Sequence, residues 1–341
     1  MRCSPDPYRH LGIALGFAAD LVWADPGRYH PVAGFGRLAL ALEDALHPVG
    51  DAPVPSGPVA RVRGVALTSV LVGGAAVSVG AVDRALAARP AWRAAWTATT
   101  VWASLGGTSL LGVAARQADL LGSGDVAGSR ALLPWLCGRD PSALGVDDLA
   151  RAVVESVAEN TSDASVATLL WAAVAGPAGA AAHRAANTLD AMVGHRSERY
   201  RDFGWASARL DDVLGWPAAR AAGLLTAALA GVAGGRARES LRVWRRDAAA
   251  HPSPNAGVVE AATAGALGVR LGGRTPYPYG VEHRPTLGDG AAPGPADVRR
   301  AVRLMRAVQV GAALVAVAGQ ASAHGWRSRS RRRAARRCSA S

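Results

Sequence analysis

Apolar residues of this 341-residue chain gather in long uncharged blocks, with polar residues between them. Four blocks are about 19 residues or longer, at 64–82, 97–115, 164–182 and 213–235, the last interrupted by Pro217 and Arg220. A shorter fifth covers 310–323. Helices of about 20 apolar residues match the hydrocarbon thickness of a bilayer, and membrane helices that pack closely are rich in Gly, Ala and Ser, as these blocks are. The pattern predicts an all-α, multi-pass integral membrane protein with about four to five apolar helices.

The segments between the blocks are expected to form helical polar loops, and no strand pattern stands out. Residues 116–163 look helical, and residues 24–63 surround a helical stretch at 35–46. Residues 11–23 are too short to span a membrane and are expected to form a buried or interfacial helix. The alternative is a large soluble protein with buried helices, but four or five such blocks in one chain favour the membrane. One or two blocks being re-entrant or peripheral stays open.

Charge is concentrated at the end of the chain, where seven arginines fall within 327–337 and account for much of the net charge of +12. We expect one membrane-embedded domain at 1–323 and a disordered Arg-rich tail at 324–341. Such a tail is attracted to anionic lipid and is expected on the cytoplasmic side of the cell membrane. No aromatic residue separates these arginines, which argues against nucleic-acid binding. Three scattered cysteines are too few for a disulfide framework or a zinc site.

A ladder of acidic residues is the strongest candidate for chemistry. Glu155, Glu159 and Asp163 are spaced i, i+4, i+8 and share one helical face, just before an uncharged block. Asn160-Thr161-Ser162-Asp163 recurs as Asn187-Thr188-Leu189-Asp190, and two such faces meeting would offer oxygen ligands suited to Mg²⁺. The ordinary alternative is surface pairing, because Arg151 and Glu155 form an i, i+4 pair and either aspartate could cap a helix.

Other polar residues stand at the edges of the apolar blocks. Asp211-Asp212 precedes the fourth block, with Arg209 beside it, and a solvated helix start explains them equally well. His30-Pro31 and the segment 251–255 are rigid turns that open with histidine, and a histidine before proline is more often a turn residue than a ligand. Without lysine there is no Walker A loop, so Arg and Mg²⁺ would have to hold any nucleotide phosphates.

Taken together, the short motifs resemble one family over about Leu11 to Ala323. In chain order they are Asp20, Asp25-Pro26, His30-Pro31-Val32, Gly138-Arg139-Asp140, the ladder 155–163, Asn187-Thr188-Leu189-Asp190, Arg209-Leu210-Asp211-Asp212, His251-Pro252-Ser253-Pro254-Asn255 and 265–272. This ordered set resembles the cobalamin-biosynthesis membrane proteins called CbiB or CobD, the adenosylcobinamide-phosphate synthases. Thr168 departs from the family pattern, where a proline is usual, and His195 departs where an aromatic residue is usual.

The resemblance implies an enzyme that joins a propionate side chain of adenosylcobyric acid to aminopropanol, or its phosphate, through an amide bond, with ATP as co-substrate. On this basis Glu155, Glu159, Asp163 and Asp190 are expected to be catalytic and to hold Mg²⁺ on the ATP phosphates. Asp211 or Asp212 is expected to take a proton from the attacking ammonium. The expected substrate-binding residues are Arg139 and Arg209 for phosphate, Asn160 and Asn187 for phosphate or corrin amides, and His30, His251 and Asn255 for the corrin pocket.

Two other functions remain in competition with the ligase. A transporter would line a solute pathway with the acidic face. A non-catalytic scaffold would gather other enzymes of the corrinoid pathway at the membrane, and it would tolerate loss of Glu155, Glu159 and Asp163. Polar motifs that lie in loops rather than within the apolar blocks favour the enzyme.

Overall fold

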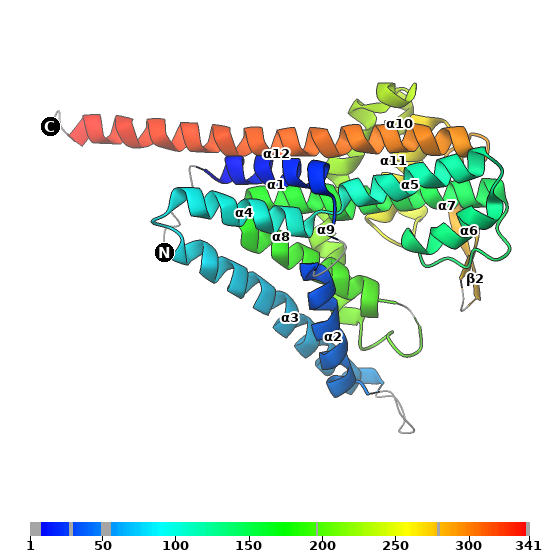
Figure 1. Ribbon diagram of the computed structural model, residues 1–341, viewed down its shortest axis with the longest axis horizontal. Coiled ribbons are helices and arrows are strands. Elements are labelled where there is room, and N and C mark those ends of the chain that lie inside the picture. Colours follow the sequence, from blue (N-terminus) through cyan, green and yellow to red (C-terminus); the bar gives the residue numbers. More distant parts are fainter. Residues whose placement is uncertain (1–7, 27–29, 49–55, 196, 278–279, 339–341) are drawn as a thin grey trace.

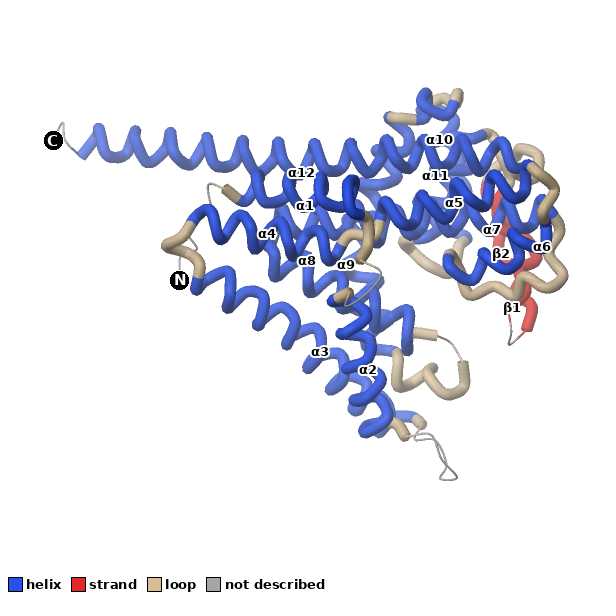
Figure 2. The backbone as a smooth tube through the Cα atoms, viewed as in Figure 1, coloured by secondary structure: helices blue, strands red, loops and turns tan. Residues whose placement is uncertain are grey.

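A computed structural model describes residues 8–26, 30–48, 56–195, 197–277 and 280–338, with side chains up to Ser322. The chain is all-α apart from one β-hairpin, as Figures 1 and 2 show, which confirms the predicted fold class. The α-helices are α1 (Arg9–Trp23), α2 (Pro31–Leu46), α3 (Gly57–Ala85), α4 (Pro90–Ser104), α5 (Gly107–Gly122), α6 (Val126–Leu132), α7 (Val146–Thr161), α8 (Thr168–Val193), α9 (Trp205–Ala228), α10 (Ala237–Asp247), α11 (Ala256–Leu267) and α12 (Pro295–Cys338).

Three helical segments of the described chain are long and apolar enough to cross a membrane: Gly57–Ala85, Val146–Val193 and Pro295–Ser322. The protein is therefore a multi-pass membrane protein, with fewer long spans than the four or five apolar blocks suggest. The block at 97–115 is not one helix, because the chain breaks between α4 and α5 at Leu105-Gly106. Asp20 explains the break, since its carboxylate accepts from the backbone nitrogen and the hydroxyl of Thr108 and so satisfies the start of α5.

The second long segment reverses direction in its middle. Gly176 adopts φ 73° and ψ −162°, a region open essentially to glycine, and Pro177 follows it directly. Beyond this turn Gly179 packs against the backbone carbonyl of Trp171, which a straight helix would hold well over one turn away. The segment therefore forms a helical hairpin whose two arms return to the same end of the molecule.

A π-helical turn, Ser162–Ala167, joins α7 to α8 at the mouth of this hairpin. It includes Asp163 and ends just before Thr168, whose hydroxyl donates to the carbonyl of Ser104 at 3.2 Å. Thr168, the position that departs from the family pattern, thus ties the first arm of the hairpin to the end of α4. π-helical turns are frequent at functional sites.

An antiparallel β-hairpin, β1 (Leu271–Tyr277) and β2 (Gly280–Leu287), lies within the polar segment for which no strand was predicted (red in Figure 2). Glycine and proline interrupt both strands, which hides the alternation that marks a strand in sequence. Arg151 of α7 fixes the hairpin by donating to the carbonyls of Gly272 and Arg274 at 2.5 and 2.8 Å.

Helix α12 continues to Cys338, so the backbone at 324–338 is helical where the sequence predicts a disordered tail. Arginine and alanine, which dominate this segment, are both strong helix formers. Residues 339–341 of the predicted tail lie outside the described residues. The buried part of α12 ends earlier, near Ala316, and belongs to the main hydrophobic core that α5, α7, α9 and α11 share with it.

Candidate active site

The helical hairpin brings the two Asn-Thr-x-Asp sequences together. Asp163 stands at the mouth of the first arm and Asp190 near the end of the second, thirteen and fourteen residues from Gly176, and the two carboxylates interact electrostatically. Glu159, one turn before Asp163, acts on both of them. The two copies of the Asn-Thr-x-Asp repeat therefore lie on the two sides of one acidic site.

Helix α9 adds Asp211 and Asp212 to the same site. The carboxyl of Asp211 accepts a hydrogen bond from Asn187 and is close enough to Asp190 and Asp163 to feel their charges. Its Oδ1 atom is buried and has no hydrogen-bond partner in the part of the chain that the structure describes. Burial, followed by the nearby Asp190 carboxylate, raises the pKa of Asp211 to about 7. This group is poised to exchange a proton near neutral pH.

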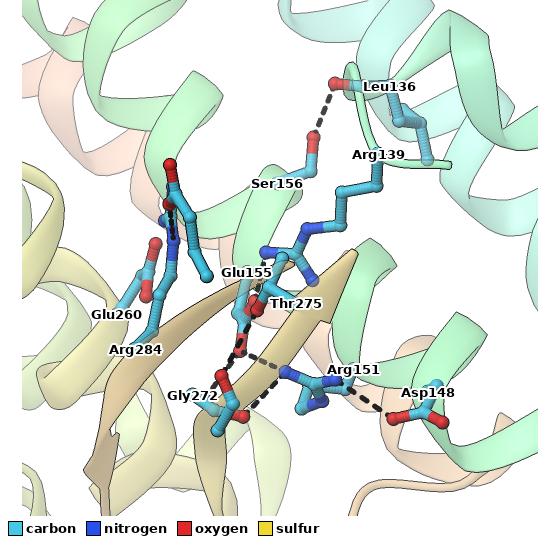
Figure 3. A network of polar contacts seen from close by, with 12 residues as sticks. Leu136, Arg139, Asp148, Arg151, Glu155, Ser156, Glu260, Gly272, Thr275 and Arg284 are labelled. Atoms are coloured by element: carbon cyan, nitrogen blue, oxygen red, sulfur yellow. Dashed lines mark hydrogen bonds and ion pairs between the residues drawn. The ribbon is translucent and has the colours of Figure 1, made fainter. Parts of the chain in front are cut away.

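Glu155 has a different environment from the rest of the ladder. It is 1% exposed and ion-pairs with Arg139, while its Oε1 atom accepts from the backbone nitrogen of Gly272 at 2.6 Å and lies 3.9 Å from Arg151 (Figure 3). Both carboxylate oxygens are therefore already engaged. Glu155 anchors the β-hairpin and the segment around Arg139 to α7, while Glu159 and Asp163 face the acidic site.

Some of the polar groups of Arg139 and Asn160 already bind other groups of the protein, which leaves fewer of them for a substrate. Arg139 is 7% exposed and keeps one buried nitrogen, Nη1, without a hydrogen-bond partner. Asn160 donates to the carbonyl of Ser156 at 2.9 Å, along its own helix. Asn187, by contrast, is turned toward Asp211.

Arg209 and Asp212 lie at a shallow surface pocket beside the acidic site. Their side chains are 3.7 Å apart, and Val213, Trp216 and Pro254 complete a pocket of about 370 Å³. Asn255, the last residue of the segment 251–255, contacts the residues around this pocket. Its amide nitrogen donates to the carbonyl of Asp212 at 2.9 Å, and its amide oxygen accepts from Arg220 at 3.0 Å. The structure thus brings Arg209, Asp212 and Asn255 together, and the prediction that Asn255 lines the corrin pocket stays a prediction.

His30 lies apart from the acidic site. Its Nδ1 atom caps α2 by accepting from Val32 at 3.1 Å, and its Nε2 atom is 3.5 Å from Asp25. Asp25 in turn interacts electrostatically with Arg184, whose other acidic neighbour is Asp163. His30 is therefore two residues removed from the ladder, and its placement is that of a helix cap.

Two charged residues that sequence reasoning missed complete the interior of this region: Glu260 on α11 and Arg284 on β2, which lie side by side in Figure 3. Glu260 is 1% exposed, and burial, with the nearby Glu155 as the next cause, raises its pKa well above the usual range. Arg284 donates to the hydroxyl of Tyr277 at 2.6 Å. A single carboxylate within the otherwise uncharged 256–267 is the same signal that marked the ladder, and it was available in the sequence.

His251 faces Glu260. Its Nδ1 atom lies 3.1 Å from the backbone nitrogen of Ser253 and 3.2 Å from the carbonyl oxygen of the same residue, so it accepts from the first or donates to the second according to the ring tautomer. Nε2 is buried, finds no hydrogen-bond partner among the described residues and lies 3.8 Å from Glu260. Burial lowers the pKa of His251, which keeps the ring neutral. The prediction that it lines the corrin pocket stays a prediction.

The donor set suits a hard cation, although the side chains do not form a closed metal cage. Carboxylate oxygens are the ligands Mg²⁺ prefers, and Asp211 offers an unpartnered one. Among the described residues no three Asp, Glu, His or Cys side chains gather closely enough to hold a metal ion. Mg²⁺ commonly needs only one or two protein carboxylates when substrate phosphates supply the other ligands, so the residues fit a metal that arrives with a nucleotide.

Known proteins resemble this chain over most of its length. The family described as CobD/Cbib protein matches residues 13–305. Proteins named "Cobalamin biosynthesis protein CobD" are 52% identical in Mycobacterium tuberculosis, over 91% of this chain and 95% of that relative, and 39% identical in Chromobacterium violaceum, over 86% and 91%. A third, in Pelobacter propionicus, is 36% identical over 94% and 97%. No solved structure matches. With a family match across most of its residues and relatives this similar, the chain belongs to the CobD/Cbib protein family.

Proposed function

We propose that this protein acts in cobalamin biosynthesis, as the names of its relatives state for them, and that it forms an amide bond. The acid is a propionate side chain of adenosylcobyric acid, and the amine is aminopropanol or its phosphate. The observation that carries the proposal is the meeting of the two Asn-Thr-x-Asp sequences with Asp211 and Asp212 at the mouth of the helical hairpin. Such a group of carboxylates suits a reaction that needs both a phosphate-bound metal and a proton acceptor.

Amide formation requires activation, because a carboxylate does not acylate an amine at a useful rate. ATP can supply it: a carboxylate oxygen attacks the γ-phosphorus, the bond to ADP breaks, and an acyl phosphate forms. The amine nitrogen then attacks the acyl carbon and phosphate leaves. The amine arrives as an ammonium and must lose one proton before it attacks and a second as the amide forms.

Asp211 is the group best placed to take the proton that frees the amine for attack. Its pKa of about 7 makes it a usable base at neutral pH, and Asn187 holds its carboxyl in place. Asp212 and Arg209 lie beside it at the surface pocket, where an ammonium and a phosphate on one short molecule would each find an opposite charge.

Glu159, Asp163 and Asp190 are the carboxylates left to bind Mg²⁺ with the ATP phosphates, since Glu155 is occupied by Arg139 and Gly272. Mg²⁺, when bound, would neutralise phosphate charge that builds up as the phosphoryl group transfers. Arg139, whose Nη1 atom has no hydrogen-bond partner among the described residues, remains a candidate donor to a phosphate oxygen.

The test is product formation by membranes that contain the protein, supplied with adenosylcobyric acid, aminopropanol phosphate and Mg-ATP. We expect mass spectrometry to show a mass gain equal to amide condensation, which disappears without ATP. Glu159→Ala should abolish the product while the protein stays in the membrane at normal levels. Asp119→Ala, which changes an exposed carboxylate on α5, is the matched control and should keep normal turnover.

Normal turnover by Glu159→Ala would reject the metal role of the ladder. A scaffold would retain its effect on the pathway when Glu159 and Asp163 are both replaced, with Glu155 left in place because it anchors the fold. A transporter would form no product in any membrane preparation but would move solute into sealed vesicles. These outcomes separate the ligase from both competing functions.

A further inference from the structure

Outside the acidic site, an apolar groove of about 280 Å³ opens on the side of the helix bundle. Helices α3 and α4 meet at their connecting turn and diverge from it, with α2 and α8 beside them (Figure 1). The groove lies among these four helices, and Trp96 of α4 crosses to α3 by donating to the carbonyl of Val79 at 3.2 Å. Its lining is mostly apolar, with Ala75, Val79 and Trp96 among it, and three threonines and one serine add hydroxyl groups.

One charged residue lines the groove, Arg184 on the second arm of the helical hairpin. Within the described residues its side chain has no hydrogen-bond acceptor and no ion pair, and its Nε atom is buried and unpartnered. Asp25 and Asp163 act on it only from a greater distance. A guanidinium set among apolar side chains without a close partner is unfavourable, so an anion that enters the groove would be strongly stabilised there.

The groove opens beside α3, one of the helices long and apolar enough to cross a membrane. Ala75 and Val79 belong to α3, whose neighbouring Val70 and Val77 are 62% and 65% exposed and continue the apolar surface outward. A ligand that reaches Arg184 by this route comes through an apolar environment and must itself be largely apolar. Three threonines and one serine also line the walls, but the hydroxyls of Thr100 and Thr188 already donate to carbonyls of their own helices, so the walls favour an apolar ligand over a free ion.

We propose that the groove binds one anionic phospholipid from the bilayer, with its phosphate on Arg184 and part of an acyl chain along α3 and α4. Guanidinium binds phosphate oxygens with two N–H groups at once, and the uncharged walls accept a chain. The volume of about 280 Å³ lies just below the usual range for ligand pockets, which suits part of one acyl chain. The proposal does not rest on amide formation, although Asp163 of the acidic site acts electrostatically on Arg184.

Native mass spectrometry of the purified full-length protein tests the proposal, with phosphatidylglycerol and phosphatidylcholine as probes. We expect the wild type to retain phosphatidylglycerol preferentially. Arg184→Gln should reduce that preference about tenfold, since one charge-assisted contact is lost. Ala75→Phe, which fills the groove and leaves Arg184 unchanged, should reduce binding of both lipids.

Arg9→Gln is the matched control, because Arg9 also has a buried unpartnered Nε atom but lies over Gly176, outside the groove. It should bind phosphatidylglycerol as the wild type does. Undiminished preference in Arg184→Gln, or undiminished binding in Ala75→Phe, would overturn the proposal. So would full displacement of the lipid by inorganic phosphate alone, which would identify a soluble anion as the occupant. Loss of amide synthesis bears on none of these readouts.

Discussion

At the scale of single residues, Asp211 determines how the site should respond to pH. A base must be ionised to accept a proton, and burial together with Asp190 raises the pKa of Asp211 to about 7. We therefore expect amide synthesis to increase as pH rises through about 7, with an inflection there. Asp211→Asn should lower the rate by about 10²–10⁴-fold and remove that inflection. Initial rates measured across pH with both proteins check this, and an unchanged inflection in the variant would assign it to another group.

Asp211 should also lower the free energy of unfolding above neutral pH. An aspartate whose pKa is raised on folding binds its proton more tightly in the folded state. Stability of the wild type should therefore fall as pH rises from about 4, the ordinary pKa of Asp, to about 7. Asp211→Asn lacks this loss and should melt at a higher temperature than the wild type at pH above 7, with a smaller difference at low pH. Asp119→Asn, at an exposed position, should show neither effect.

Replacing Glu155 and replacing Glu159 should have different effects, the first on stability and the second on activity. Glu155 is buried in an ion pair with Arg139, and removing one partner of such a pair leaves an uncompensated charge that costs about 3–5 kcal/mol. Glu155→Ala should therefore reduce the amount of folded protein. Glu159→Ala should leave that amount normal and remove activity. Thermal unfolding in detergent beside activity distinguishes the two, and equal stability of both variants would contradict the anchoring role of Glu155.

At the scale of elements, the helical hairpin depends on the backbone of Gly176. Its φ of 73° with ψ of −162° is a conformation that costs other residues about 1–3 kcal/mol. Gly176→Ala should lower the melting temperature and reduce activity, because the turn sets the distance between Asp163 and Asp190. Gly74→Ala on α3, where an added methyl group meets open space, should leave stability unchanged or raise it slightly. Activity of Gly176→Ala equal to the wild type would show that the turn is not needed for the site.

The sequence predicts helices well where a long uncharged block continues without interruption, and poorly where the backbone turns within such a block. Helices α3 and α12 follow directly from uncharged blocks at 64–82 and 310–323. The break at Gly106 depends on Asp20, a residue 86 positions away, and no local pattern reveals it. Gly176-Pro177 was visible, yet a Gly-Pro pair within an apolar block is as typical of a kinked helix as of a reversal.

In the candidate site, too, the sequence predicts what depends on local pattern and misses what depends on contacts between distant segments. The acidic residues of the ladder, Asp190 and Asp211 were found because charge is costly next to apolar helices, a rule that needs no tertiary structure. Which of them are free was not predictable, because the partner of Glu155 comes from a hairpin, at Gly272, that the sequence did not show. Glu260 was missed although the same rule applies to it. Arg284 lies in a polar segment, where one more arginine carries no signal.

At the scale of the whole molecule, apolar and polar surface separate toward opposite ends. Exposed large apolar side chains are concentrated on α1, α3, α9 and the later part of α12, among them Val62, Val77, Leu15, Leu224 and Leu314. Figure 1 shows α5, α6, α7, α10 and the β-hairpin gathered at one end, while α12 extends from there to the far side. Apolar surface of this extent indicates contact with lipid, and Asp163 of the acidic site follows directly on α7, one of the elements at the polar end.

This arrangement makes the orientation of α12 a test of the proposed reaction. If α12 crosses the bilayer, the acidic site lies on the side where α12 begins and the Arg-rich segment lies on the opposite side. The acidic site and the Arg-rich segment therefore cannot both be cytoplasmic. ATP is cytoplasmic, so we expect Ala296→Cys to react with an impermeant maleimide only after cells are opened, and Ser322→Cys to react in intact cells. Both positions are exposed, and the three natural cysteines are replaced by serine in each variant.

The two opposite outcomes have different meanings. Labelling of Ala296→Cys alone in intact cells would place the acidic site outside, where ATP is scarce, and would contradict ATP-driven activation while agreeing with the positive-inside rule for the tail. Protection of both positions would mean that α12 lies within the membrane region without crossing it. In that case α3 and the helical hairpin alone remain to span the bilayer, and a hairpin that returns to its starting side at Gly176 contributes no net crossing.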